Sequence, residues 1–181
     1  RGGLKCCHFV PLVSDELVAI PTLPALHATH AGIWIAAGGV LREASRSEAI
    51  RRLAETPHVI LNAPLVGQRL GYADVSGLDL LELFAFVHPA RFAVPTVAGM
   101  ARAVEIPPPG DERDAAGVML AIAGALLDRL GEAEWAEREG AWTANGSLYR
   151  LGWAWAPFVA ERVVQPERGE RMLFTRLPQW E

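Results

Sequence analysis

The stretch HVILNAPLVGQRLG at residues 58–71 decides the fold. Residues 58–61, a histidine followed by three apolar residues, predict a short buried strand. Asn62 predicts the N-cap of the helix that follows, with Pro64 in its first turn and Gly71 just past its end. A strand that passes directly into a capped helix is a building unit of a sheet covered by helices.

Downstream of this unit the chain predicts further helices. The block SGLDLLELFAFVHPARFAVPT at residues 76–96 predicts one helix that opens at Ser76-x-x-Asp79 and ends before Pro89. A second helix is expected from Pro95-Thr96, up to the run of three prolines at 107–109. Residues 111–130 predict the longest helix, because acidic residues at its start and a basic one near its end suit the helix dipole.

Upstream, the pattern changes to strands. Residues 25–36 predict a strand, and Ala37-Gly38-Gly39 predicts a hairpin turn into a second one. Ser45-x-x-Glu48 is a capping-box signature that predicts a helix directly after it. Strands first and helices later indicate an α/β or α+β sheet covered by helices.

Length and composition bound the class of protein. The chain has 181 residues, 51% of them hydrophobic, which is enough for one globular domain with an extension. Its net charge of −4 lacks the basic footprint of a free-standing nucleic-acid binder. No apolar run is long enough to span a bilayer, and Cys6 and Cys7 are adjacent and allow no disulfide framework. We expect a cytoplasmic location and no membrane partner.

The sequence divides into three parts. Residues 1–24 predict an N-terminal arm or a short extra strand, and residues 25–131 predict the sheet domain. Residues 132–181 predict a helical extension rich in tryptophan, with Trp135, Trp142, Trp153 and Trp155 close together. Tryptophans at this density favour core or interface anchors, and stacking on nucleic-acid bases is the alternative.

The densest group of basic residues lies around the first expected helix. Glutamates interleave with these arginines, which favours a solvated surface with ion pairs within the helix. Contact with a DNA backbone is the alternative. The candidate DNA-binding residues are Arg42, Arg46, Arg51, Arg52 and Arg69.

Four blocks of the sequence resemble the N-terminal region of a bacterial group of DinG-like ATP-dependent DNA helicases. They are LNAPLVGQRLGY, SGLDLLELFAFVHPARFAVPT, EWAEREGAWT and ERGERMLFTRLPQWE, and the resemblance covers residues 24–181. In that group the region precedes the helicase motor. It looks like a degenerate DnaQ-like (DEDDh) 3'-5' exonuclease domain, with a ribonuclease H-like mixed sheet flanked by helices.

The resemblance implies that the chemical residues of the exonuclease are lost. His27 and Thr29 stand at the two carboxylate positions of the first motif. In the second motif Asn62 is kept, but Val66 replaces the Asp. In the third, Asp114 is a candidate carboxylate, whereas Pro109 replaces the His. Because a two-metal nuclease needs its carboxylates to hold the cations, we expect no catalytic residue and no metal in this segment.

Two other constellations have simpler explanations. His27 and His30, with His58 or His88, are candidate metal ligands by residue type, but strand alternation puts the first two on opposite faces. Asp79 and Glu82 share a helix face, and capping and exposure explain them.

The resemblance also implies the rest of the protein. We expect an accessory role in DNA unwinding during replication or repair, with the motor of the same chain as partner and DNA as a possible one. A Gly-x-x-x-x-Gly-Lys-Ser/Thr loop is absent from the chain. ATP and magnesium are therefore expected in a motor encoded beyond Glu181. The alternatives are a protein-interaction module that docks through the Trp-rich extension, and a weak non-specific DNA guide.

Overall fold

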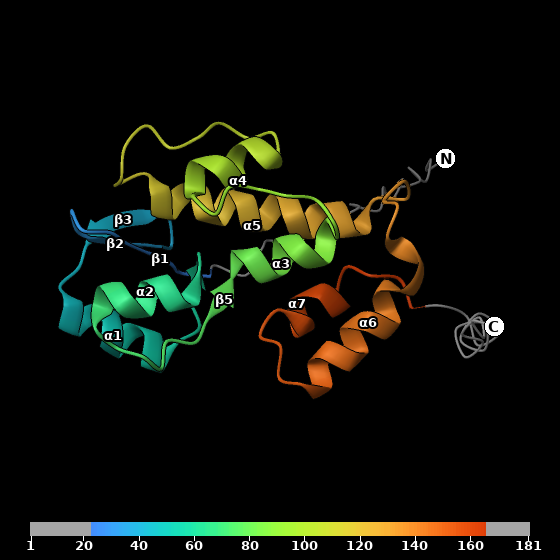
Figure 1. Ribbon diagram of the computed structural model, residues 1–181, viewed down its shortest axis with the longest axis horizontal. Helices are drawn as coiled ribbons and strands as arrows, with labels where there is room; N and C mark the ends of the chain where they lie inside the picture. Colours follow the sequence, from blue (N-terminus) through green and yellow to red (C-terminus); the bar gives the residue numbers. More distant parts are fainter. Residues whose placement is uncertain (1–22, 166–181) are drawn as a thin grey trace, which may run out of the picture.

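The protein is an α/β structure in which helices flank a five-stranded mixed sheet (Figure 1). The structure, a computed structural model, describes residues 23–165. The expected N-terminal arm therefore lies almost entirely outside the described residues, as do Cys6, Cys7 and the end of the extension. Among residues 23–165, no helix combines the length and the apolar character needed to cross a membrane.

The sheet has the strand order β3-β2-β1-β4-β5. The pairs β1–β2 and β2–β3 are antiparallel, and the pairs β1–β4 and β4–β5 are parallel. The strands are β1 (Ala25–Ala28), β2 (Ile33–Ala37), β3 (Val40–Glu43), β4 (Val59–Ile60) and β5 (Leu78–Asp79).

The prediction of one strand over residues 25–36 is wrong, because a tight turn splits it into β1 and β2. The amide of Thr29 donates to the carbonyl of Gly32 at 2.9 Å, and its hydroxyl accepts from the amide of Ala31 at 3.1 Å. The hairpin turn predicted between the next two strands is confirmed. Gly38 and Gly39 have φ angles of 56° and 77°, which glycine adopts without steric cost.

Seven helices follow or interrupt the strands within the described residues. They are α1 (Arg46–Glu55), α2 (Ala63–Leu70), α3 (Leu80–Val87), α4 (Val97–Ala103), α5 (Ala115–Gly131), α6 (Arg138–Arg150) and α7 (Ala156–Ala160).

Three helix starts lie where their capping residues predict them. Ser45, Asn62 and Thr96 each accept a hydrogen bond from the amide three residues later, at 3.1 to 3.2 Å. Two starts differ from the prediction. Asp79, not Ser76, caps α3, because residues 78–79 are taken up by β5. α5 begins at Ala115 rather than at 111, because the Asp111 carboxylate accepts the amides of the next turn.

Side-chain alternation along the strands gives the sheet a core on each face. Ala25, Val59 and Leu78 pack toward α3, α4 and α5, whereas Leu26 and Ile60 pack toward α1 and α2. Figure 1 shows this arrangement, with α1 and α2 on one side of the sheet and α4 and α5 on the other. The face toward α5 carries the larger core.

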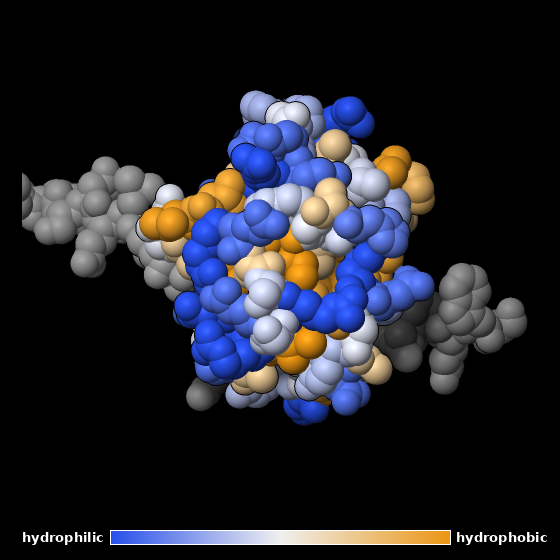
Figure 2. Space-filling model, turned by 90° about the vertical axis from the view of Figure 1, so that its left-hand side faces the viewer, coloured by the Kyte–Doolittle hydropathy of each residue, from blue (hydrophilic) through white to orange (hydrophobic). Residues whose placement is uncertain are grey.

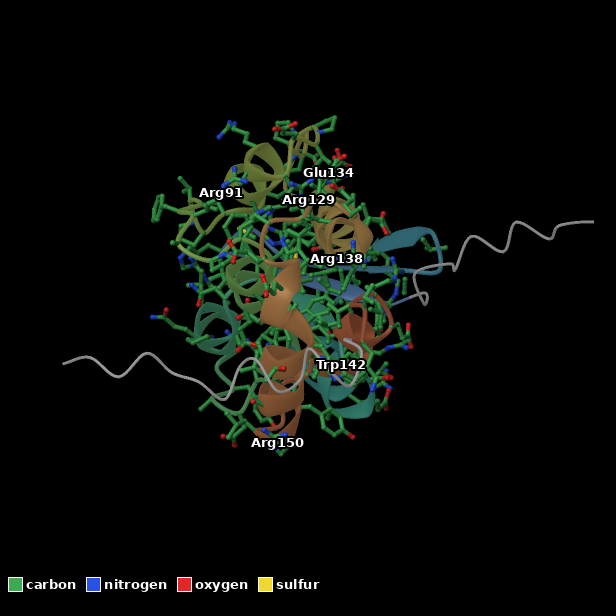
Figure 3. The ribbon with its side chains drawn as sticks, turned by 90° about the vertical axis from the view of Figure 1, so that its right-hand side faces the viewer. Arg91, Arg129, Glu134, Arg138, Trp142 and Arg150 are labelled. Carbon is green, nitrogen blue, oxygen red and sulfur yellow. The ribbon has the colours of Figure 1, made fainter. Side chains whose placement is uncertain are left out.

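The chain after α5 adds α6 and α7 to this larger core. Trp135 and Trp155 are buried in it together with residues of α3 and α5. Trp142 and Trp153 are half-buried against the same cluster. Figure 3 views the end of the molecule that α6 forms, with Arg138, Trp142 and Arg150 in succession along it.

Candidate functional site

A cleft of about 550 Å³ opens between the end of β1, helix α2, the start of α4 and the turn before α5. Its walls are mainly apolar. Figure 2, which views this end of the molecule, shows hydrophobic side chains in the middle of the face with hydrophilic ones around them. The lining residues are Leu26, His27, Ala28, Thr29, Leu61, Leu65, Val66, Arg69, Pro95, Thr96, Val97, Ala98, Pro109, Asp111, Glu112 and Ala115.

The cleft brings together positions that are far apart in the sequence. His27 and Thr29 reach it from the end of β1, Val66 from α2, and Pro109 from the loop that precedes α5. These are the positions at which the resemblance implies lost catalytic residues. Of the remaining motif positions, Asn62 lies at the start of α2 with a φ of 64°, where it caps the helix.

Asp114 does not line the cleft. It is the exposed N-cap residue of α5, and its side chain makes no capping hydrogen bond. Asp111 and Glu112 line the cleft in its place. The acidic residues of GDERD at 110–114 are the sequence signal that could have identified this turn. The prediction of a helix from residue 111 puts Asp111 and Glu112 in that helix instead.

One polar contact crosses the cleft. His27 Nε2 lies 2.8 Å from Glu112 Oε2, joining residues 85 positions apart in the chain. The His27 ring also stacks on Trp34 of β2, with ring centroids 6.2 Å apart. The imidazole is thus held by partners on two sides, and it spans from the sheet to the turn before α5.

The lining does not fit the two-metal centre of an active exonuclease. The only carboxylates on the walls described here are Asp111 and Glu112, which are neighbours on one turn. Asp111 Oδ1 already accepts the amides of Arg113 at 2.7 Å and Asp114 at 3.1 Å. On the opposite wall Val66 offers no ligand atom. Across residues 23–165, no group of three or more His, Cys, Asp or Glu side chains is arranged to hold a metal ion.

Asp79 lies outside the cleft, and its buried carboxylate joins two helices. Oδ1 accepts the amides of Asn62 and Leu81, each at 3.0 Å, and Oδ2 accepts the amide of Ala63 at 2.7 Å. These amides belong to the first turns of α2 and α3, whose N–H groups have no partner within their own helix. The prediction that Asp79 caps a helix is confirmed. The expectation that it is exposed is wrong, because its carboxylate is buried where it accepts these amides.

Glu82 lies in the first turn of α3, and its carboxylate bonds to the C-terminal extension. Trp153 Nε1 donates to Glu82 Oε2 at 3.0 Å. Partial desolvation and the neighbouring charge of Asp79 raise the pKa of Glu82, and the bond from Trp153 opposes that rise.

The arginines predicted as DNA contacts fall into two groups. Three of them are engaged by glutamates: Arg42 with Glu48 at 2.7 Å, Arg51 with Glu55 at 2.7 Å, and Arg52 with Glu48 at 3.9 Å. This is the ion-paired helix surface that the interleaved charges favour. Contact of these three arginines with DNA stays a prediction.

The other two arginines, Arg46 and Arg69, lie together in a second pocket of about 480 Å³. Its remaining lining residues are Thr29, His30 and Gln68. Arg69 and Thr29 line the cleft as well, so the two hollows adjoin.

The chain thus has an apolar cleft, without the metal ligands of a nuclease, beside a basic pocket. His58 and His88, the other candidate metal ligands, line neither the cleft nor the basic pocket.

Comparisons of this chain with protein-family models, with curated proteins and with solved structures found no match.

Proposed function

We propose that this chain is a non-catalytic accessory domain of an ATP-dependent DNA helicase, with a ribonuclease H-like, DnaQ-exonuclease-like fold. The observation that carries the proposal is the convergence of His27, Thr29 and Val66 on one cleft with the turn before α5. These positions are separate in the sequence, and the exonuclease motifs alone identify them. Their common location is what an exonuclease-like fold requires.

The residues at these positions support a role without nuclease chemistry. Phosphodiester cleavage by two metals depends on carboxylates that hold both cations around the attacking and leaving oxygens. Threonine and valine cannot replace those carboxylates. The mixed sheet flanked by helices supports the fold assignment, since the exonuclease-like domain is built on such a sheet.

A nuclease assay tests the loss of chemistry. The purified chain, given single-stranded or mismatched DNA with magnesium or manganese, is expected to release no nucleotides. Asp114→Ala is the matched control, because Asp114 is the one motif carboxylate left. Metal-dependent release that co-purifies with the chain, whether or not it survives this substitution, would overturn the proposal.

The sequence of the parent gene tests the helicase assignment. The gene is expected to continue beyond the codon for Glu181 into a Gly-rich loop followed by Lys and Ser or Thr. Such a loop holds nucleotide phosphates with its backbone amides and its lysine. A parent gene without this loop would contradict the assignment and leave the fold proposal untouched.

A second candidate function is docking on the motor through the C-terminal extension. Trp135 and Trp155 serve the internal core. Tyr149 and Leu151, at the end of α6, are 65% and 83% exposed and offer an apolar contact. Leu151→Ser is expected to weaken binding to the separately expressed motor. Phe92→Ser is the control, because Phe92 is 87% exposed and lies outside the C-terminal extension. Equal losses of binding in the two variants would contradict docking through Tyr149 and Leu151.

A further inference from the structure

We propose that the pocket lined by Thr29, His30, Arg46, Gln68 and Arg69 binds a phosphate group. Arg46 is the first residue of α1, and Arg69 lies in the last turn of α2. The turn that follows β1 supplies Thr29 and His30. Three separate segments thus place two guanidinium groups and an imidazole around one hollow, and no carboxylate of residues 23–165 lines it.

The strongest observation is at Arg69. Its Nη1 is buried and has no hydrogen-bond partner among the described residues. A buried N–H of a charged group that lacks a partner costs free energy, and in native proteins such a group is usually completed by a ligand, an ion or an ordered water. A guanidinium presents its donors in a planar fork that matches two oxygens of a phosphate.

Arg46 provides the second cation. Its Nη2 makes one long contact, 3.4 Å, to the main-chain carbonyl of Arg69, which brings the two side chains to the same wall. Within residues 23–165, every ion pair involves other residues, so neither arginine is neutralised by a carboxylate there. This separates the pair from Arg42, Arg51 and Arg52, whose charges are met by glutamates.

The polar residues of the pocket and its surroundings favour an anion. His30 is exposed and Gln68 presents an amide, so both can donate to an oxyanion. Of the two acidic side chains that line the adjoining cleft, Glu112 contacts His27 and Asp111 accepts the amides of Arg113 and Asp114. A divalent cation would meet only positive or neutral groups here.

The ligand we infer is a phosphate ester. The pocket adjoins the apolar cleft through Thr29 and Arg69, so the organic part of the ester has an apolar surface beside the phosphate. Free phosphate, a nucleoside monophosphate and the backbone of a single strand share this chemistry. The inference rests on the pocket alone, and it holds whether or not the chain belongs to a helicase.

Titration of the purified chain tests the site. The probes are inorganic phosphate, thymidine monophosphate and a short oligothymidylate, followed through the Nε–H signals of the arginines in NMR spectra. The Arg69 signal is expected to shift with a phosphate probe, and binding to weaken as salt is raised. A shift with all three probes indicates a general phosphate site, and a shift with the oligonucleotide alone indicates strand recognition. No shift of Arg69 with any probe would overturn the proposal.

Three substitutions that each remove one positive charge separate the pocket from general electrostatic attraction. Arg46→Gln and Arg69→Gln are expected to weaken binding roughly tenfold, the size of one lost charge-assisted hydrogen bond. Arg51→Gln, on the exposed surface of α1, is expected to change it less than about twofold. Arg46 is exposed, so its variant keeps the test valid if Arg69→Gln impairs folding. If the folded variants Arg46→Gln and Arg69→Gln lose no more affinity for the probe than Arg51→Gln does, net charge alone attracts the probe. That result would refute the pocket.

Discussion

The indole Nε1 of Trp155 donates a 2.7 Å hydrogen bond to the main-chain carbonyl of Asp79, 76 residues earlier. Trp135 Nε1 makes a similar bond to the carbonyl of Val87 at 2.9 Å, and Trp153 bonds to Glu82. All three acceptors lie in α3 or at its N-cap, so three hydrogen bonds hold the C-terminal extension against this one helix. Because an indole has a single donor that must be met when buried, these bonds fix where each ring can sit.

Trp155→Phe is expected to destabilise the protein by about 2–3 kcal/mol, through a cavity and the carbonyl of Asp79 left without its donor. The side chain is completely buried. Trp142→Phe is the matched control, since Trp142 is half-buried and no hydrogen bond of its indole is seen within residues 23–165. Urea unfolding measures both. Equal midpoints for the two variants would contradict the anchoring role.

Asp79→Asn is expected to lower the free energy of unfolding by about 2–3 kcal/mol, because the amide replaces one acceptor oxygen with a donor. Either amide orientation turns an NH₂ group toward an N–H of α2 or α3. Hydrogen exchange should quicken at Asn62, Ala63 and Leu81.

The control for this substitution is Asp111→Asn. Asp111 is exposed, and both of its amide partners use the same oxygen, Oδ1, which asparagine retains. Its effect should stay below about 0.5 kcal/mol, as for most surface changes. If Asp111→Asn lowers the free energy of unfolding as much as Asp79→Asn does, the structural role assigned to the Asp79 carboxylate is wrong.

The features that the sequence predicts well are those whose chemistry is local. The caps at Ser45, Asn62 and Thr96 each join a side chain to an amide three residues away, so residue type and spacing suffice. The hairpin turn at Gly38-Gly39 is equally local.

The features that it misses depend on contacts between distant segments. Asp79 bonds to amides 16 and 17 residues earlier, and this pairing sets the start of α3 in place of Ser76. Glu112 meets His27 across 85 positions, and no local pattern marks it as part of the cleft. The orphaned Nη1 of Arg69 likewise becomes visible only once α2 is placed beside the turn after β1.

Stability is expected to fall as the pH drops through about 6.5, the ordinary pKa of histidine. Burial lowers the pKa of His58 in the folded protein, although the bond of its Nδ1 to the carbonyl of Thr56 at 2.7 Å opposes this. The unfolded state then binds more protons than the folded one near that pH, so acid favours unfolding. Burial lowers the pKa of His88 too, in the same direction.

His58→Asn should flatten this pH dependence, and urea midpoints at pH 7.5 and 5.5 measure it. An asparagine amide can still donate to Thr56. Glu82 acts in the opposite sense at lower pH: its raised pKa gives stability that is present in acid and lost as the pH rises through that pKa. A wild-type slope of the opposite sign between pH 7.5 and 5.5 would contradict the role of His58.

Gly99 and Gly117 make a final matched pair, because both lie within helices and only one is crowded. A Cβ at Gly99 would lie 2.5 Å from the Val94 carbonyl oxygen and 2.7 Å from the Val94 Cβ. A Cβ at Gly117 would meet nothing within 4 Å. Gly117→Ala should therefore raise stability by about 0.5–1 kcal/mol through its better helix propensity.

Gly99→Ala should lower stability, because the loop that ends at Thr96 must move away from α4. That loop lines the cleft through Pro95 and Thr96, so the shift should also alter the NMR signals of His27 on the opposite wall. Thermal unfolding and amide spectra of the two variants provide the measurements. If Gly99→Ala proves as stable as Gly117→Ala, with unchanged signals at the cleft, the close approach of Val94 does not hold this wall in place.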